Sequence, residues 1–285
     1  MRSFLFVPAD SERKLARGPL SGADTLILDL EDSVALANRP AARVLARGFL
    51  DATGGAGFQR WVRINPLASG IALDDLSAVM QGRPNGILLP KCVPDDVRTL
   101  DHYLSAFEAA AALPLGGTRV IAIATETPAA MFAIGNYAGV SSRLSGITWG
   151  AEDLAACIGG ANRRADGIYD DVYRLARSLC LLAASAAGVE PIDTIYTNFR
   201  DEAGLALECV VAKRSGFTGK MAIHPAQIAT INRAFTASDD ELASARQVVA
   251  LFADNPDAGV VALDGKMLDR PHLTLARRLL GLSPR

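Results

Sequence analysis

The sequence TLILDL at residues 25–30 is followed at once by Glu31 and Asp32. A continuous apolar run of this kind is typical of a strand whose two faces are both buried, as in a parallel sheet. Seven more short runs rich in Leu, Ile, Val or aromatic residues occur along the chain, each bounded by Gly, Pro or charged residues. They cover residues 4–7, 61–64, 86–89, 120–124, 146–149, 194–196 and 221–223. We therefore predict eight buried strands.

Longer stretches rich in Ala, Leu and Arg separate these runs and have the spacing of amphipathic helices. Helices are expected over residues 74–81, 97–112, 129–137, 172–187, 201–215 and 240–252. Strands that alternate with helices in one uninterrupted series predict an α/β fold, a closed (β/α)8 TIM barrel. No strand is followed by GxGxxG, and GxxxxGK[ST] does not occur, which argues against the common nucleotide-binding sheets. We expect the barrel over residues 1–258 and a C-terminal appendage, a strand, turn and helix, over 259–285.

Composition excludes several classes of protein. The chain has 285 residues, half of them apolar, and a formal net charge of −2, so neither a nucleic acid nor an anionic membrane is an expected partner. The four cysteines, Cys92, Cys157, Cys180 and Cys209, form no CxxC or Cys/His cluster, which favours reduced thiols over zinc or disulfides. The apolar stretch near the N-terminus is too short for a signal peptide or a membrane span. A cytoplasmic location is expected.

Ionisable residues gather after the predicted strands, not before them. Residues of this kind after the runs are Asp10, Arg13, Asp29, Glu31, Asp32, Arg63, Lys91, Glu126, Glu152, Asp153 and His224. In a (β/α)8 barrel the carboxyl ends of the strands meet at the face that carries the active site. The sequence thus predicts a polar rim with an active site.

Glu126 and Asp153 follow neighbouring predicted strands, and such strands run about 4.8 Å apart. Two carboxylates at that separation repel each other unless a cation or a proton lies between them. Mg²⁺ is commonly held by one or two carboxylates together with water and substrate oxygens. We expect Glu126 and Asp153 to bind Mg²⁺, with Mn²⁺ as the alternative ion. The other interpretation is a pair of surface carboxylates in loops.

Two basic residues of the rim allow more than one interpretation. Arg63 ends a strand, where a guanidinium could bind a substrate carboxylate or enolate oxygen, or form an ion pair with Glu31 or Asp32. Lys91 could form a Schiff base with a keto acid if burial lowered its pKa, but nearby carboxylates would keep it charged. Asp29, Glu31 and Asp32 either lie behind the metal's water ligands or cap the next helix.

Several motifs together resemble a known family. They are RSFLFVPAD at 2–10, LDLEDSV at 28–34, RINP at 63–66, LLPK at 88–91, ATETP at 124–128, WGAEDL at 149–154, GFTGKMAIHPAQ at 216–227 and DGKMLDRPH at 264–272. In this order and spacing the chain resembles the citrate lyase β-subunit-like proteins, within the wider group of malyl-CoA and citramalyl-CoA lyases and HpcH/HpaI aldolases. The resemblance spans nearly the whole chain.

The resemblance implies roles for individual residues. Glu126 and Asp153 match the family's metal ligands, and Arg63 matches the arginine that faces the substrate oxygens. The backbone of Ala151, Glu152 and Asp153 matches the turn that receives the carboxylate of the oxo acid. Asp269 matches a C-terminal catalytic acid that, in several members, enters the site from a neighbouring subunit. His224 belongs to the family's IHP element beside the thioester channel, and Arg163 and Arg164 are the nearest basic pair for the CoA phosphates.

The implied activity is Mg²⁺-dependent cleavage or formation of a 3-hydroxyacyl-CoA thioester of the malyl-, citramalyl- or citryl-CoA type. An oxo acid and an acyl-CoA are the implied partners, and the implied assembly is a homo-oligomer, a trimer or a hexamer. Three alternatives remain: a class II aldolase that acts on a free 2-oxo acid, a malyl-CoA thioesterase, and the β subunit of a citrate lyase complex. A binding protein without catalytic activity would not need the polar rim.

Overall fold

Residues 1–164 and 167–282 are described by the computed structural model of the chain. The chain divides into two compact units, Met1–Phe235 and Thr236–Arg285. Among the described residues, no helix is long and apolar enough to span a membrane.

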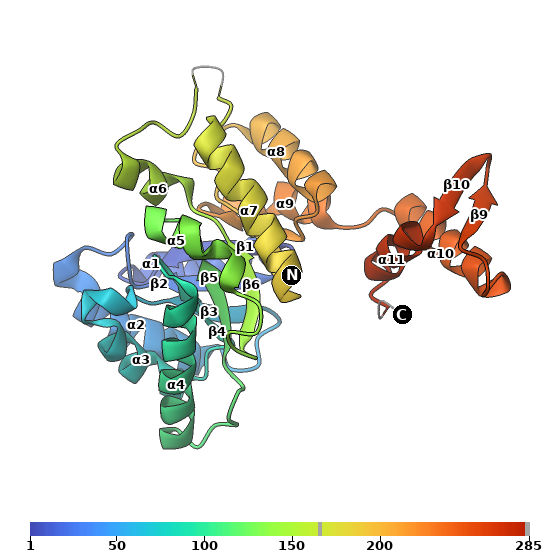
Figure 1. Ribbon diagram of the computed structural model, residues 1–285. Helices are drawn as coiled ribbons and strands as arrows, with labels where there is room; N and C mark the ends of the chain where they lie inside the picture. Colours follow the sequence, from blue (N-terminus) through green and yellow to red (C-terminus); the bar gives the residue numbers. More distant parts are fainter. Residues whose placement is uncertain (165–166, 283–285) are drawn as a thin grey trace. The chain divides into compact units, whose positions relative to one another are not determined.

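The first unit is a closed barrel of eight parallel strands (Figure 1). The strands are β1 (Ser3–Pro8), β2 (Thr25–Asp29), β3 (Gln59–Arg63), β4 (Gly86–Leu89), β5 (Arg119–Ile123), β6 (Leu144–Thr148), β7 (Glu190–Asp193) and β8 (Gly219–Ala222). Each strand pairs with the next, and β1 pairs with β8. The predicted (β/α)8 barrel is confirmed.

Helices cover the outside of the barrel. They are α1 (Glu12–Arg17), α2 (Arg39–Ala52), α3 (Ala72–Val79), α4 (Pro94–Ala110), α5 (Pro128–Ala133), α6 (Ala151–Ile158), α7 (Asp171–Ala187), α8 (Glu202–Ser215) and α9 (Ile228–Phe235). The predictions for α3, α4, α5, α7 and α8 agree with the structure to within a few residues. Helices α1, α2, α6 and α9 were not predicted; α1 has six residues, α6 and α9 have eight, and helices so short give a weak periodic signal.

Two separate apolar cores result from the alternation of side chains along the strands. Inside the barrel, a small cluster of residues includes Phe4, Trp61, Ile121, Ile123 and Met221. A larger cluster, with Leu28, Val62, Leu89 and Ile147 among its members, lies between the strands and the helices. The strands are therefore buried on both faces, as their sequences predicted.

The seventh strand was placed wrongly. The run at residues 194–196 lies beyond it, and the strand is Glu190–Asp193, with Pro191 inside it. Proline lacks an N–H for the ladder and normally argues against a strand in the middle of a sheet. The carbonyl of Pro191 nevertheless accepts a hydrogen bond from the Thr218 backbone N–H at 3.0 Å. The strand therefore loses only the one hydrogen bond that the proline nitrogen cannot donate.

The second unit begins earlier than the predicted boundary after residue 258. It contains α10 (Asp239–Asp254), a hairpin of β9 (Val260–Leu263) and β10 (Lys266–Asp269), and α11 (Arg270–Leu279). Helix α10 packs against α11, and Arg270 lies over the ring of Phe252 at 5.5 Å. The appendage is thus a helix, a two-stranded hairpin and a second helix, where one strand, a turn and a helix were expected.

Candidate active site

A cavity of about 190 Å³ opens among the carboxyl ends of the strands. Its wall includes Arg63, Glu126, Ala151, Glu152 and Asp153, all of them predicted site residues. The apolar side chains of Phe6, Ile123 and Met221 also line it. The structure thus brings the predicted carboxylates and Arg63 to one cavity with a partly apolar wall.

Glu126 follows β5 and is almost wholly buried, with 2% of its surface exposed. Its Oε2 accepts a hydrogen bond of 2.5 Å from the backbone N–H of Lys91. Burial raises the pKa of Glu126 well above its usual range, and the charge of Asp153 raises it further. A cation beside this carboxylate would therefore stabilise its charged form.

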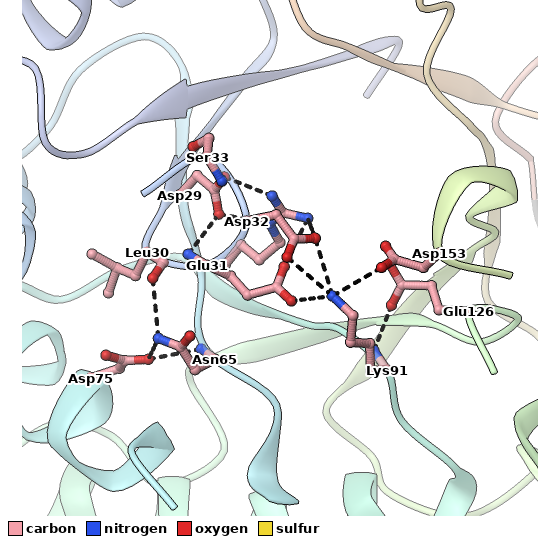
Figure 2. A network of polar contacts seen from close by, with 11 residues as sticks. Asp29, Leu30, Glu31, Asp32, Ser33, Asn65, Asp75, Lys91, Glu126 and Asp153 are labelled. Carbon is pink, nitrogen blue, oxygen red and sulfur yellow. Dashed lines mark hydrogen bonds and ion pairs between the residues drawn. The ribbon is translucent and has the colours of Figure 1, made fainter. Parts of the chain in front are cut away.

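Asp153 lies in the first turn of α6, next along the rim from Glu126 (Figure 2). The turn before α6 is tightly packed: a Cβ on Gly150 would come within 2.8 Å of Glu126 Cγ. The Gly150 N–H also donates to Thr125 Oγ1 at 3.0 Å. Glycine is needed at this position because the backbone approaches Glu126 so closely.

These carboxylates fit a hard divalent ion that also takes water and substrate oxygens as ligands. Among residues 1–164 and 167–282 no group of three or more His, Cys, Asp or Glu side chains could hold a metal. Two carboxylates with waters and a substrate are the usual environment of Mg²⁺ in enzymes, whereas a structural zinc site needs four protein ligands. Glu126 and Asp153 would hold the Mg²⁺.

Arg63 forms an ion pair with Asp29, a partner that was not predicted from the sequence. Its Nε and Nη2 each donate to Asp29 at 2.6 Å, and Nη1 lies 3.0 Å from Glu31 Oε2. Burial alone would lower the pKa of Arg63, but Asp29 raises it above its ordinary value. Burial likewise would raise the pKa of Asp29, and the charge of Arg63 brings it below its usual range. Arg63 is therefore a fixed positive charge at the cavity.

Glu31 is a buried carboxylate between two cations, Arg63 and Lys91. Figure 2 shows its contact with Lys91. Its Oε2 is within ion-pair distance of Arg63 but, among the described residues, has no partner in hydrogen-bonding geometry. Burial raises the pKa of Glu31 to about 7, against the lowering effect of Arg63 and Lys91. Glu31 and Asp29 thus lie behind Arg63 and do not cap a helix with their side chains, whereas Asp32 lines the cavity.

Lys91 adopts a left-handed backbone conformation with φ of 48°. Its Nζ contacts Glu31, lies 3.1 Å from Asp32 Oδ2 and lies 3.2 Å from Asp153 Oδ1. Burial alone would lower the pKa of Lys91, but these carboxylates, Glu31 foremost, raise it above its ordinary value. A lysine held in the charged form is no nucleophile, which argues against Schiff-base chemistry.

His224 lies at a second cavity, of about 250 Å³, beside β1, α1 and the loop after β8. Arg13, Lys14 and Arg17 also line this cavity, and Phe6 borders both cavities. The His224 ring stacks on Phe199 at 4.7 Å, and its Nδ1 accepts a hydrogen bond from the Ala226 N–H. His224 is therefore near the rim but outside the carboxylate cavity.

The other expected residues lie elsewhere. Arg163 pairs with Glu208, and Arg164 pairs with Asp170, so both are already engaged in ion pairs. Asp269 precedes α11 in the second unit, where its Oδ1 lies 2.5 Å from His272 Nδ1. Its role in an active site stays a prediction.

A buried ion pair between two neighbouring strands was missed. Asp193 and Lys220, on β7 and β8, are each 0% exposed and lie 3.0 Å apart. A signal was present, because a lysine inside the apolar sequence GKMA is costly to bury without a partner. The predicted strand began at residue 221 and left Lys220 out.

Comparison with known proteins agrees with this architecture. The family model described as HpcH/HpaI aldolase/citrate lyase matches residues 2–225. The chain is 34% identical over 282 residues to the citrate lyase subunit beta of Haemophilus influenzae, covering 98% of this chain and 95% of that protein. It is also 34% identical over 285 residues to the (3S)-malyl-CoA thioesterase of Cereibacter sphaeroides, covering 98% and 93%.

Solved structures show the same likeness. The crystal structure of the protein CitE from Mycobacterium tuberculosis in complex with magnesium, acetoacetate and coenzyme A has 34% sequence identity and a TM-score of 0.77 to this chain. The match covers 98% of this chain and 97% of that one. The chain therefore belongs to the HpcH/HpaI aldolase/citrate lyase family and is a magnesium-dependent lyase.

Proposed function

We propose that this enzyme cleaves, and in reverse forms, the carbon–carbon bond of a 3-hydroxyacyl-CoA thioester of the malyl-, citramalyl- or citryl-CoA type. The observation that carries the proposal is the pair of carboxylates, Glu126 and Asp153, beside the fixed guanidinium of Arg63. Two acids suit a divalent cation, and the cation of Arg63 suits the oxygen charge that develops as the bond breaks. We assign Mg²⁺ to the two carboxylates, with Mn²⁺ as a substitute.

In the cleavage direction, a base takes the 3-hydroxyl proton and the carbon–carbon bond breaks, which gives a 2-oxo acid and a thioester enolate. The enolate then takes up a proton at its α-carbon to give the acyl-CoA. The N–H groups of Ala151, Glu152 and Asp153, at the start of α6, would receive the carboxylate of the oxo acid. Arg63 would stabilise the charge on the reacting oxygen. Bound Mg²⁺ would supply Lewis-acid polarisation of the oxo group.

In the condensation direction, a base must remove a proton from the α-carbon of an acetyl or propionyl thioester. We assign this step to Asp269, following the resemblance of the KMLD segment to the family's C-terminal acid. In a homo-oligomer, a trimer or a hexamer, this residue would enter the site of a neighbouring subunit. Light scattering coupled to gel filtration measures the assembly.

The cavity beside α1 supports a thioester as substrate. Arg13, Lys14 and Arg17 lie on one short helix at its edge, and among the described residues none of the three has an ion-pair partner. Three uncompensated cations suit the phosphates of a CoA thioester. His224 lies in the same wall, consistent with the thioester passing from this cavity towards the carboxylates along Phe6.

The decisive assay offers malyl-, citramalyl- and citryl-CoA with and without Mg²⁺ and follows glyoxylate, pyruvate and oxaloacetate. The Glu126→Gln variant should lose metal-dependent turnover and Mn²⁺ binding, because its neutral amide does not replace a carboxylate ligand. Asp95→Asn is the matched control, since Asp95 is an exposed acid on α4 whose side chain is 84% accessible. Full activity of Glu126→Gln would remove the basis of the proposal.

One alternative product has specific support, because a relative is named a (3S)-malyl-CoA thioesterase. Hydrolysis of malyl-CoA on this scaffold would yield free malate instead of glyoxylate. Two further alternatives are separated by substrate: a class II aldolase would turn over free hydroxy-oxo acids without CoA, and the β subunit of a citrate lyase complex would need its carrier and transferase partners. Turnover of CoA esters by the purified chain argues against both.

The free thiols of all four cysteines support a reducing, cytoplasmic location.

A further inference from the structure

A group of buried and half-buried charges touches the chain on both sides of α6, the helix that carries Asp153. Before α6, Trp149 Nε1 donates to Asp193 Oδ1 at 2.8 Å. After α6, Arg163 Nη2 donates to Glu208 Oε2 at 3.0 Å. The two acceptors, Asp193 at the end of β7 and Glu208 on α8, belong to different elements.

Lys220 joins these two contacts. Its Nζ lies 3.0 Å from Asp193 Oδ2 and 2.7 Å from Glu208 Oε1, and the residue is 0% exposed. Arg177 on α7 completes the surroundings of Asp193, with Nε 3.0 Å from Oδ1. We call Trp149, Asp193, Lys220, Glu208 and Arg163 the α6 clamp.

The clamp is a costly arrangement for stability alone. Burying charges is expensive even when they are paired, and apolar replacements of equal size are often at least as stable. Burial alone would raise the pKa of Asp193, but Lys220 and Arg177 bring it below its usual range. Asp193 is thus held as a carboxylate, and the hydrogen bonds of the group have fixed directions.

The segment that the clamp holds has little room to move. Trp149 is followed by Gly150, which already lies against the side chain of Glu126. Trp149 also packs edge-on against Tyr169 at 5.1 Å between ring centres, and Arg163 lies over the same Tyr169 ring at 3.7 Å. A shift of Trp149 would therefore move α6 relative to Glu126.

We propose that Lys220 is a positioning residue of the active site, which fixes both ends of α6 through Asp193–Trp149 and Glu208–Arg163 so that Asp153 faces Glu126. The effect on metal binding rests on the proposed function. The effect on the mobility of α6 does not.

Replacing Lys220 itself would leave two acids short of a cation and threaten the fold, so the flanking contacts are the better test. Trp149→Phe removes the indole N–H and keeps an aromatic ring. Trp61→Phe is its matched control, because Trp61 is the other tryptophan of the chain and its buried Nε1 has no hydrogen-bond partner among the described residues.

Two measurements follow the variants: hydrogen–deuterium exchange of the peptide that covers residues 150–158, and Mn²⁺ affinity by electron paramagnetic resonance. Trp149→Phe should speed exchange in α6 and weaken Mn²⁺ binding about tenfold, the usual range for loss of a partner behind a metal ligand. Trp61→Phe should lower the melting temperature without either change. Identical results for the two variants would overturn the proposal.

The far end of α6 is tested with Arg163→Gln against Arg164→Gln, whose arginine pairs with Asp170 and Asp171. Only Arg163→Gln should speed exchange in α6 and weaken Mn²⁺ binding. If it raised the KM of the thioester and left exchange unchanged, Arg163 would be a phosphate ligand and the clamp would be refuted at that end. Should Glu126→Gln bind Mn²⁺ like the wild type, the proposed function fails, while the exchange comparison still decides whether the clamp exists.

Discussion

Two of the three nitrogens of the Arg63 guanidinium are occupied by Asp29, and Nη1 lies beside Glu31. A lysine keeps the charge but cannot reproduce this fork. We expect Arg63→Lys to lower kcat about 10²- to 10³-fold, the usual cost of losing one preorganised donor to a developing oxyanion. Steady-state kinetics with each CoA ester measure the loss.

Arg60→Lys is the control on the same strand. Arg60 donates to the carbonyls of Leu50 and Arg83, away from the cavity. Its replacement should leave kcat unchanged. Equal losses in both variants would mean that Arg63 acts only through the stability of β3.

Glu31 should make the stability of the protein depend on pH. Its folded pKa of about 7 lies above the ordinary value of 4.5, so the folded state binds the proton more tightly than the unfolded state. The resulting stabilisation is fully present below pH 4.5 and is lost as the pH rises through about 7. Each unit of difference in pKa corresponds to about 1.4 kcal/mol.

Urea unfolding with a chelator at pH 5 and pH 8 tests this, using Glu31→Gln as the reference that cannot titrate. The free energy of unfolding of the wild type, relative to Glu31→Gln, should be about 1–3 kcal/mol larger at pH 5 than at pH 8, so that the wild type is the more stable at pH 5. The same difference at both pH values would show that Glu31 does not titrate in this range.

At the scale of single residues, the sequence was informative where position alone determines proximity. Arg63, Glu126 and Asp153 were predicted together because the carboxyl ends of parallel strands converge on one face. Asp29 as the partner of Arg63 was not predicted, because that pair depends on the register of β2 against β3, in which the two residues lie side by side. The clamp was missed for a similar reason, since its residues are distant in sequence.

Helix α1 carries a prediction at the scale of an element. Removing two of its cations with Arg13→Gln/Arg17→Gln should raise the KM of a CoA thioester about tenfold, equivalent to about 1.4 kcal/mol of binding. Turnover of a free oxo acid, if any, should not change. The wild-type KM should also rise with salt more steeply than that of the variant, because salt screens exposed charges.

Arg214→Gln removes an arginine from the last turn of α8 and serves as the control. If it raises the KM as much as the α1 variant does, the KM depends on the net charge of the protein and not on the cavity beside α1.

The elements themselves were predicted well where the hydrophobic pattern is long, as in α4 and α7. The strand β7 was not, because Glu190 and Pro191 interrupt its pattern and the apolar residues after Asp193 gave a stronger signal.

For the whole molecule, the two units raise the question of how Asp269 acts. We expect Asp269→Asn to keep Mn²⁺ binding and lose turnover, because the residue would move a proton and hold no metal. If Asp269 serves a neighbouring subunit, mixing Asp269→Asn with Glu126→Gln and allowing subunits to exchange should restore activity. Each variant mixed with itself is the control.

Full activity of Asp269→Asn would contradict its assignment as the base. Failure of the mixed sample to regain activity, with subunit exchange shown by mass spectrometry, would contradict a role of Asp269 in a neighbouring subunit.

The boundary between the units was predicted too late because α10 reads as one more amphipathic helix of the barrel. Its place is decided by packing against α11, which periodicity does not reveal.

The contact between Gly150 and Glu126 has a practical use. The backbone at Gly150 is extended, with φ of −126°, so an alanine can adopt it, yet its methyl group would collide with the glutamate. The Gly150→Ala variant should therefore lose turnover because the methyl group displaces the Glu126 side chain, while no charged residue of the rim is replaced. It offers crystallographers a means to capture an uncleaved thioester in a protein that still attracts it.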